Sequence, residues 1–117
     1  MKLFVYGTLR SEQPAHGLLR GAKLVARVRT EPQFTLVDTM AGYPAMIEGG
    51  TTSIVGEIYE LDEAALGELD RYEEAPEFFQ RVTRRIAGHD VWVYLLPERQ
   101  AVGQPPIASG DWCKRTP

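Results

Sequence analysis

Residues 54–73 read IVGEIYELDEAALGELDRYE, and this stretch joins a strand pattern to a helix pattern. Residues 54–61 combine β-branched, aromatic and leucine side chains, which is typical of a β-strand. Asp62 follows directly, and its carboxylate is suited to accept from the free N–H groups at the start of a helix. The stretch therefore predicts a strand that leads almost without a loop into a short helix.

Glu73 lies on the apolar stripe of this predicted helix. It follows Leu69 by four positions and Leu66 by seven, and residues at these spacings share one helix face. Pro76 disfavours helical geometry at Ala75, so we expect the helix to end there with Glu73 in its last turn. Burial and the negative end of the helix dipole both raise the pKa of a carboxyl group in this place, as a general base requires.

A second interpretation of Glu73 is that the helix frays early and the carboxylate pairs with Arg71 or Arg81 at the surface. Periodicity alone slightly favours this interpretation, because acidic residues are common near helix ends. Three further acidic residues fall off the apolar stripe, and we expect them to be solvated: Glu63, Asp70 and Glu74.

Outward from this stretch, alternation and aromatic content predict further strands over residues 3–6, 23–29, 34–37, 81–86 and 91–96. The short turn of residues 87–90 predicts a hairpin between the last two of these. Residues 40–46 contain Gly and Pro and are expected to form a loop, and the tail from Gly103 is expected to wrap the domain in an extended form. About six strands and one helix indicate an α+β fold whose sheet is able to curl into a barrel.

Length and composition favour one soluble domain over residues 1–117, with 44% hydrophobic and 25% charged residues. A net charge of −3 without a long basic run argues against nucleic-acid binding. The chain contains no apolar run of the length that a signal peptide or membrane span needs, so we expect a cytoplasmic location. Cys113 is the single cysteine, and His16 and His89 are isolated, so the sequence predicts neither a disulfide nor a metal site.

The turn after the first predicted strand is a second candidate functional element. Gly7 lets the chain bend sharply and removes the Cβ that keeps a ligand away from the backbone. Consecutive N–H groups of Gly7, Thr8 and Leu9 can form an anion-binding nest for a carboxylate or an oxyanion. Alone, this motif is more often an ordinary strand-ending glycine turn. Tyr43 and Phe79 are candidate pocket walls, although turn formation and core packing explain them equally well.

Several short motifs occur in a characteristic order along the chain. They are VYGTL at residues 5–9, GYPA at 42–45, VGEIYEL at 55–61, LDRYEEAP at 69–76, FQR at 79–81 and GDW at 110–112. This ordered set resembles the gamma-glutamylcyclotransferase superfamily. The short length and the Tyr-Gly-Thr-Leu form are most similar to the gamma-glutamylaminecyclotransferase branch and its small bacterial relatives.

The resemblance implies a small mixed β-barrel with flanking short helices. It also implies that Glu73 is the catalytic acid and base and that the loop of Tyr6, Gly7, Thr8 and Leu9 holds a glutamyl group. Two positions depart from the pattern. Glu74 stands where some relatives carry glycine, and Thr8 replaces the serine of the glutathione-related branches, which bears on substrate choice.

The reaction that the resemblance implies is a cofactor-independent cyclisation of a gamma-glutamyl amine or amide. The α-amine of the substrate attacks its own side-chain carbonyl, and 5-oxoproline and a free amine are released. Two alternatives stay open: a non-catalytic domain of the same fold that binds a small metabolite, and an interaction domain that uses a sheet edge or the tail. Retention of Glu73 argues against the binding domain, because a buried carboxylate repels an acidic ligand.

Overall fold

The computed structural model describes residues 1–114, in which seven strands and one α-helix are formed. The strands are β1 (Lys2–Val5), β2 (Lys23–Arg29), β3 (Phe34–Asp38), β4 (Pro44–Glu48), β5 (Val55–Glu60), β6 (Gln80–Ile86) and β7 (His89–Leu95). The helix α1 spans Glu63–Tyr72, and three short 3-10 helices are η1 (His16–Leu19), η2 (Glu98–Gln100) and η3 (Trp112–Lys114). The predicted strand over 23–29 is confirmed in full, and the other predicted strands begin or end within one or two residues of the observed ones.

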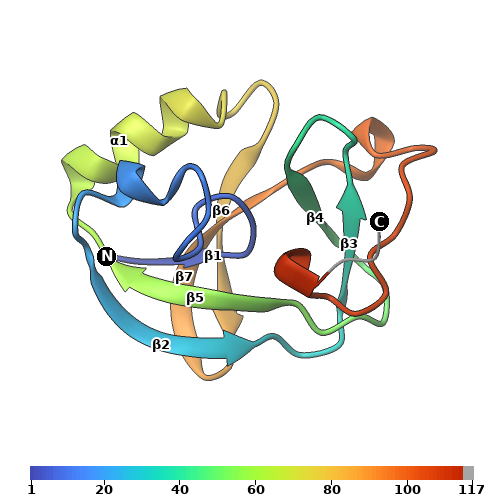
Figure 1. The fold of residues 1–117 in the computed structure, drawn as a ribbon, viewed down its shortest axis with the longest axis horizontal. Helices are drawn as coiled ribbons and strands as arrows, with labels where there is room; N and C mark the ends of the chain where they lie inside the picture. Colours follow the sequence, from blue (N-terminus) through green and yellow to red (C-terminus); the bar gives the residue numbers. More distant parts are fainter. Residues whose placement is uncertain (115–117) are drawn as a thin grey trace.

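Five strands form one sheet in the order β2-β5-β1-β7-β6 (Figure 1). The central place of β1 follows from its sequence, because a strand with apolar residues on both faces must be covered on both sides. β1 pairs antiparallel with β5 and parallel with β7. The edge strand β2 instead alternates strictly between half-buried and exposed residues, and its outer face carries Lys23, Arg27 and Arg29. Exposed basic side chains of this kind protect an edge from pairing with another chain.

The two faces of the large sheet carry two hydrophobic cores. Leu3 and Val5 of β1 join the core that includes Leu66 and Leu69 of α1. Phe4 points to the other face and joins the core of the β3–β4 hairpin and the C-terminal segment. The β3–β4 hairpin contributes to both cores, with Val37, Ala45 and Ile47 in the first and Phe34, Leu36 and Met46 in the second. It lies beside the large sheet, apart from the helix (Figure 1).

Helix α1 begins as the sequence predicts. Asp62 adopts an extended conformation, and its Oδ1 accepts from the N–H of Ala65 at 2.8 Å, which caps the helix start. The helix ends at Tyr72, slightly before the predicted end, and Glu73 is its C-terminal cap rather than a member of the last turn. Glu74 then adopts a left-handed conformation with φ 55°. Glycine is the residue that adopts this conformation most readily at a helix end, so Glu74 holds a backbone geometry that is uncommon for its residue type.

Strands β3 and β4 form a separate two-stranded sheet. Two sheets replace the closed barrel that we expected, so among the described residues the α+β class is found but barrel closure is not. The predicted loop over 40–46 was wrong for its second half. Pro44 begins β4, where a proline is tolerated as the first residue of a strand, and the apolar residues Ala45, Met46 and Ile47 continue it.

The remaining connections follow their turn chemistry. Ala87 and Gly88 join β6 to β7 with positive φ values of 50° and 84°, as a tight hairpin turn requires. In the tail, the N–H of Ile107 donates to Leu36 at 2.7 Å, and Trp112 is buried in the second core. Within residues 1–114, no helix has the length and apolar character needed to cross a lipid bilayer.

Candidate active site

A cavity of about 220 Å³ opens between the turn after β1, the start of β4 and the segment that follows α1. All seven residues that the sequence singles out as site candidates line it: Tyr6, Gly7, Thr8, Leu9, Tyr43, Glu73 and Phe79. They come from three distant parts of the chain. The fold therefore brings the candidate base and the candidate anion-binding turn into one cavity.

Glu73 is held at the cavity by the end of α1. Its N–H donates to the carbonyl of Leu69 at 2.8 Å, so the backbone keeps the side chain on the face that Leu69 buries. Within residues 1–114, no hydrogen bond or ion pair reaches its carboxylate. Burial raises the pKa of Glu73 from 4.5 to about 7. The predicted direction is thus found, with burial as its cause, and a proton can be taken up or released near neutral pH.

The turn after β1 has internal hydrogen-bond partners for its carbonyl groups but, among the described residues, none for its N–H groups. The carbonyls of Gly7 and Thr8 accept from the N–H groups of Arg10 at 3.0 Å and Ala15 at 2.9 Å. The carbonyl of Leu9 accepts from His16 Nδ1 at 2.9 Å. In contrast, the N–H groups of Gly7, Thr8 and Leu9 find no acceptor among the described residues. The three consecutive residues line the cavity, and N–H groups without a partner among the described residues are a donor set suited to an anion.

Gly7 is required by a close approach between this turn and β4. A Cβ at this position would lie 2.6 Å from Cγ and 2.7 Å from Cδ of Pro44, which is shorter than any normal carbon–carbon contact. Because glycine has no Cβ, the turn can approach Pro44 and the two together form one wall of the cavity. The glycine therefore has a packing role beyond making the bend.

Tyr6 is held by two buried hydrogen bonds. Its hydroxyl donates to the carbonyl of Tyr94 at 2.6 Å and accepts from the N–H of Met46 at 3.1 Å. Burial raises the pKa of this phenol, and the nearby Glu73 charge adds to the effect. The hydroxyl is thus occupied by the protein itself, and Tyr6 ties the start of the turn to β4 and β7.

Aromatic rings form another wall of the cavity. The rings of Tyr43 and Phe79 lie 6.1 Å apart, and Phe78 meets Phe79 edge to face at 5.2 Å. Burial raises the pKa of Tyr43, with a further contribution from Glu73. Phe79 is at once a core residue and a cavity residue, so the two interpretations from sequence are compatible.

Asp70 and Arg81 are paired with each other, which corrects two expectations. Arg81 Nε and Nη2 donate to the two carboxylate oxygens of Asp70 at 2.7 and 3.0 Å, and the hydroxyl of Tyr94 donates to Asp70 at 2.7 Å. Asp70 is therefore paired and only partly exposed, where a solvated side chain was predicted, and Arg81 is not the partner of Glu73. Arg81 also stacks over the ring of Trp92 at 4.3 Å. Within the described part of the chain, these contacts leave the carboxylate of Glu73 without a cation.

Further cavity residues were not predicted from the sequence: Phe4, Val5, Tyr72, Phe78 and Tyr94. The signal for Tyr94 was present in the alternation of its strand, which places Tyr94 and Val93 on opposite faces. Which face meets the cavity depends on the sheet order, however. In the described part of the chain, no three His, Cys, Asp or Glu side chains gather closely enough to hold a metal ion.

Comparison with known proteins places these features in a family context. The family model described as Gamma-glutamyl cyclotransferase, AIG2-like matches residues 3–114. A Vibrio cholerae protein named "Putative gamma-glutamylcyclotransferase" is 36% identical over 113 residues, which cover 97% of this chain and 96% of that protein. The Escherichia coli "Gamma-glutamylcyclotransferase family protein YtfP" is 30% identical over 115 residues, which cover 98% of each chain. The crystal structure of a mouse AIG2-like protein matches with a TM-score of 0.72 at 30% identity and covers 80% of this chain and 75% of that one.

Proposed function

The chain belongs to the gamma-glutamyl cyclotransferase, AIG2-like family, and from this premise we propose that it cyclises gamma-glutamyl amines or amides with Glu73 as general acid and base. The observation that carries the proposal is the pairing of two features in one cavity. One is a carboxylate without a partner among the described residues, and the other is a set of three free N–H groups at Gly7, Thr8 and Leu9.

The proposed reaction begins with the α-ammonium group of the substrate. Glu73 takes a proton from it, and the neutral amine attacks the side-chain carbonyl carbon of the same glutamyl group. A new C–N bond closes the five-membered ring, and the carbonyl oxygen becomes a transient oxyanion. The original amide C–N bond then breaks as Glu73 returns the first proton to the leaving nitrogen. The ring nitrogen loses its second proton, which passes to the released amine, so that the amine leaves as an ammonium ion. The products are 5-oxoproline and the free amine, so atoms and protons balance without a further reactant.

The turn of Gly7, Thr8 and Leu9, called the donor turn from here on, has a complementary role in this proposal. The carbonyls of this turn already have hydrogen-bond partners, and these bonds hold its backbone in place. The N–H groups of the turn can therefore stabilise the α-carboxylate or the oxyanion without reorganising. The aromatic wall of Tyr43 and Phe79 excludes water and restricts the folded glutamyl chain to attack geometries. Intramolecular reactions held in such geometries reach effective molarities on the order of 10⁵ M.

The proposal is tested with a panel of gamma-glutamyl amines, amides and peptides and detection of released 5-oxoproline by mass spectrometry. Glu73→Gln keeps the shape of the side chain but cannot accept the proton, so we expect release to fall by about 10² or more. Glu63→Gln, an exposed change at the start of α1, is the matched control and is expected to retain wild-type activity. Release at the wild-type rate by Glu73→Gln contradicts the role of Glu73, and binding without turnover by the wild type favours the non-catalytic alternative.

A further inference from the structure

Glu57 is a buried carboxylate outside the cavity, and the proposed reaction makes no use of it. It lies on β5 and is 3% exposed. Its Oε1 accepts from the N–H of Ser11 at 2.8 Å and from the hydroxyl of Tyr59 at 2.9 Å, and its Oε2 accepts from the Ser11 hydroxyl at 2.9 Å. Arg27 Nε lies 3.8 Å from Oε2. Glu57 therefore holds both the backbone and the side chain of Ser11.

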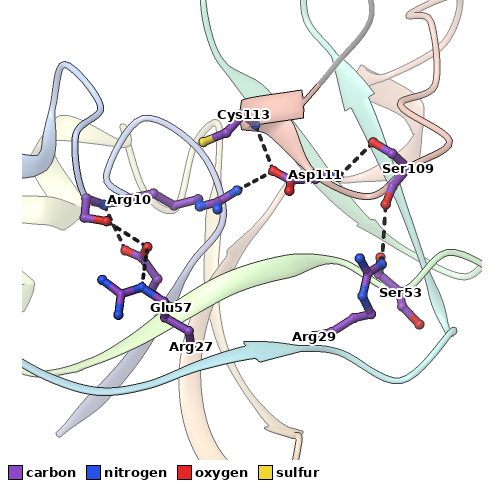
Figure 2. A network of polar contacts seen from close by, with 9 residues as sticks. Arg10, Arg27, Arg29, Ser53, Glu57, Ser109, Asp111 and Cys113 are labelled. Carbon is purple, nitrogen blue, oxygen red and sulfur yellow. Dashed lines mark hydrogen bonds and ion pairs between the residues drawn. The ribbon is translucent and has the colours of Figure 1, made fainter.

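The residue before Ser11 is anchored in a second place. Arg10 Nη1 donates to Asp111 Oδ1 at 2.8 Å, and both side chains are close to nine-tenths buried. Asp111 Oδ1 in turn accepts from the N–H of Cys113 at 3.0 Å, and the N–H of Asp111 donates to Ser109 Oγ at 3.2 Å. Figure 2 shows the two anchors side by side, with Arg10 reaching the tail and Glu57 meeting the loop from below.

The two residues that these anchors hold, Arg10 and Ser11, directly follow the donor turn along the chain. Arg10 donates its N–H to the carbonyl of Gly7, and Ala15 donates to the carbonyl of Thr8. The direction of the free N–H groups thus depends on where the loop of residues 10–15 is held. The burial of a carboxylate carries a large desolvation penalty unless hydrogen-bond donors reach its oxygens, so Glu57 and its donors tolerate only a narrow range of geometries.

We propose that Glu57 is a positioning residue: by holding Ser11 it fixes the loop of residues 10–15 and so directs the N–H groups of Gly7, Thr8 and Leu9 into the cavity. This inference rests on the proposed function for its catalytic consequence, but its structural part stands by itself. Burial alone raises the pKa of Glu57, yet the donors from Ser11 and Tyr59 and the charge of Arg10 outweigh it and lower the pKa. The anchor therefore stays ionised where Glu73 titrates.

Three variants form a graded test. Glu57→Leu removes all acceptors from the anchor, and Ser11→Ala removes only the contact from the hydroxyl. Glu57→Gln is the conservative variant, because its amide oxygen still accepts from the Ser11 N–H and its NH₂ group can donate to Ser11 Oγ. The matched control is Thr30→Val. Thr30 is 3% exposed and its Oγ1 accepts from the N–H of Ile54 at 2.9 Å, but it does not line the cavity.

The first measurement is hydrogen exchange at the amides of Arg10 and Ala15, whose bonds hold the turn. We expect exchange to rise about tenfold in Glu57→Leu and about threefold in Ser11→Ala, with smaller changes in Glu57→Gln and none in Thr30→Val beyond its effect on global stability. The second measurement is kcat/KM for 5-oxoproline release, which is expected to fall in the same order while its pH midpoint stays unchanged.

The outcomes separate this inference from the proposed function. A wild-type protein that releases no 5-oxoproline contradicts the function, and the exchange data still test the anchor. Unchanged exchange at Arg10 and Ala15 in Glu57→Leu overturns the anchor whether or not the wild type is active. Changed exchange with unchanged kcat/KM overturns the link from loop to turn. If Glu57→Leu does not fold, Ser11→Ala decides the matter alone, and wild-type exchange at both amides in that variant overturns the inference.

Discussion

The acidic side chains that lose contact with water in this protein fall into two groups, those with a lowered pKa and one with a raised pKa. Asp70, Glu57 and Asp111 each lose exposure to water, which raises the pKa, but hydrogen bonds from neighbouring donors outweigh this and lower it. Glu73 has no such donors in the described part of the chain, and burial raises its pKa to about 7. Of these four residues, Glu73 is therefore the one that can exchange a proton near neutral pH, because the others stay ionised there.

A stability measurement tests this difference at Glu73. The folded state holds the Glu73 proton up to about pH 7, whereas a solvated side chain releases it near 4.5. The ionisation of Glu73 therefore does not lower the free energy of unfolding below about pH 4.5, and it lowers this free energy increasingly as the pH rises to about 7. Glu73→Gln removes the ionisation, so relative to the wild type it is expected to gain up to about 3 kcal/mol in free energy of unfolding between these limits.

Urea unfolding of both proteins at pH 5 and pH 8 measures this gain. The control is Glu63→Gln, in which the difference from wild type is expected to be the same at both pH values. A gap between wild type and Glu73→Gln that is equal at pH 5 and pH 8 contradicts a raised pKa at Glu73.

At the scale of elements, the site depends on where α1 ends and on how closely the turn after β1 approaches β4. The first feature comes from local sequence, because Glu73 follows the apolar stripe of Leu66 and Leu69. For the second, the local sequence shows only that Gly7 stands two positions after Val5, the last residue of β1. The approach between Gly7 and Pro44 joins residues far apart in the chain, so it became visible only in the fold.

Gly7→Ala tests the close approach. The new Cβ would overlap Pro44 Cγ and Cδ, so either β4 or the turn must move. We expect a loss of about 1 to 3 kcal/mol in free energy of unfolding, as overpacking typically costs, together with a loss of 5-oxoproline release. Gly17→Ala is the control, because a Cβ there meets no atom within 4 Å. Equal melting temperatures of the two variants would show that the turn tolerates the added carbon.

The sequence was informative about elements with one strong local pattern and less so about partners between elements. The alternation of β2, the cap at Asp62 and the hairpin turn at Gly88 are local, and the structure confirms them. Asp70 was misjudged, because periodicity within α1 cannot show that β6 and β7 bring Arg81 and Tyr94 to its exposed side.

For the same reason the start of β4 was missed. Gly42 and Pro44 indicate a loop, and only pairing with β3 makes Pro44 a strand residue. The site itself was predicted as separate pieces, and the ordered family resemblance was what linked Glu73 to the donor turn. That all of these residues line one cavity was a result of the fold.

At the scale of the whole molecule, Arg10 and Asp111 join the two ends of the chain. Arg10 follows the donor turn, and Asp111 lies in the C-terminal segment that packs with the β3–β4 hairpin. The contact thus connects the donor turn, whose Leu9 belongs to the core beneath α1, with the C-terminal segment, whose Trp112 belongs to the second core. Such a link lets the stability of the tail influence the geometry of the site.

Removing one partner of this pair is expected to be costly. Asp111→Ala leaves the Arg10 guanidinium largely buried without its carboxylate, so we expect a loss of about 3 kcal/mol in free energy of unfolding. The double variant Arg10→Met with Asp111→Leu removes both charges and is expected to recover much of this loss, because an apolar pair of similar volume needs no desolvation of ions. Asp90→Ala breaks the exposed pair with Arg85 and serves as the control without a measurable change. If Asp111→Ala unfolds at the same urea concentration as Asp90→Ala, the link between the two ends contributes no stability.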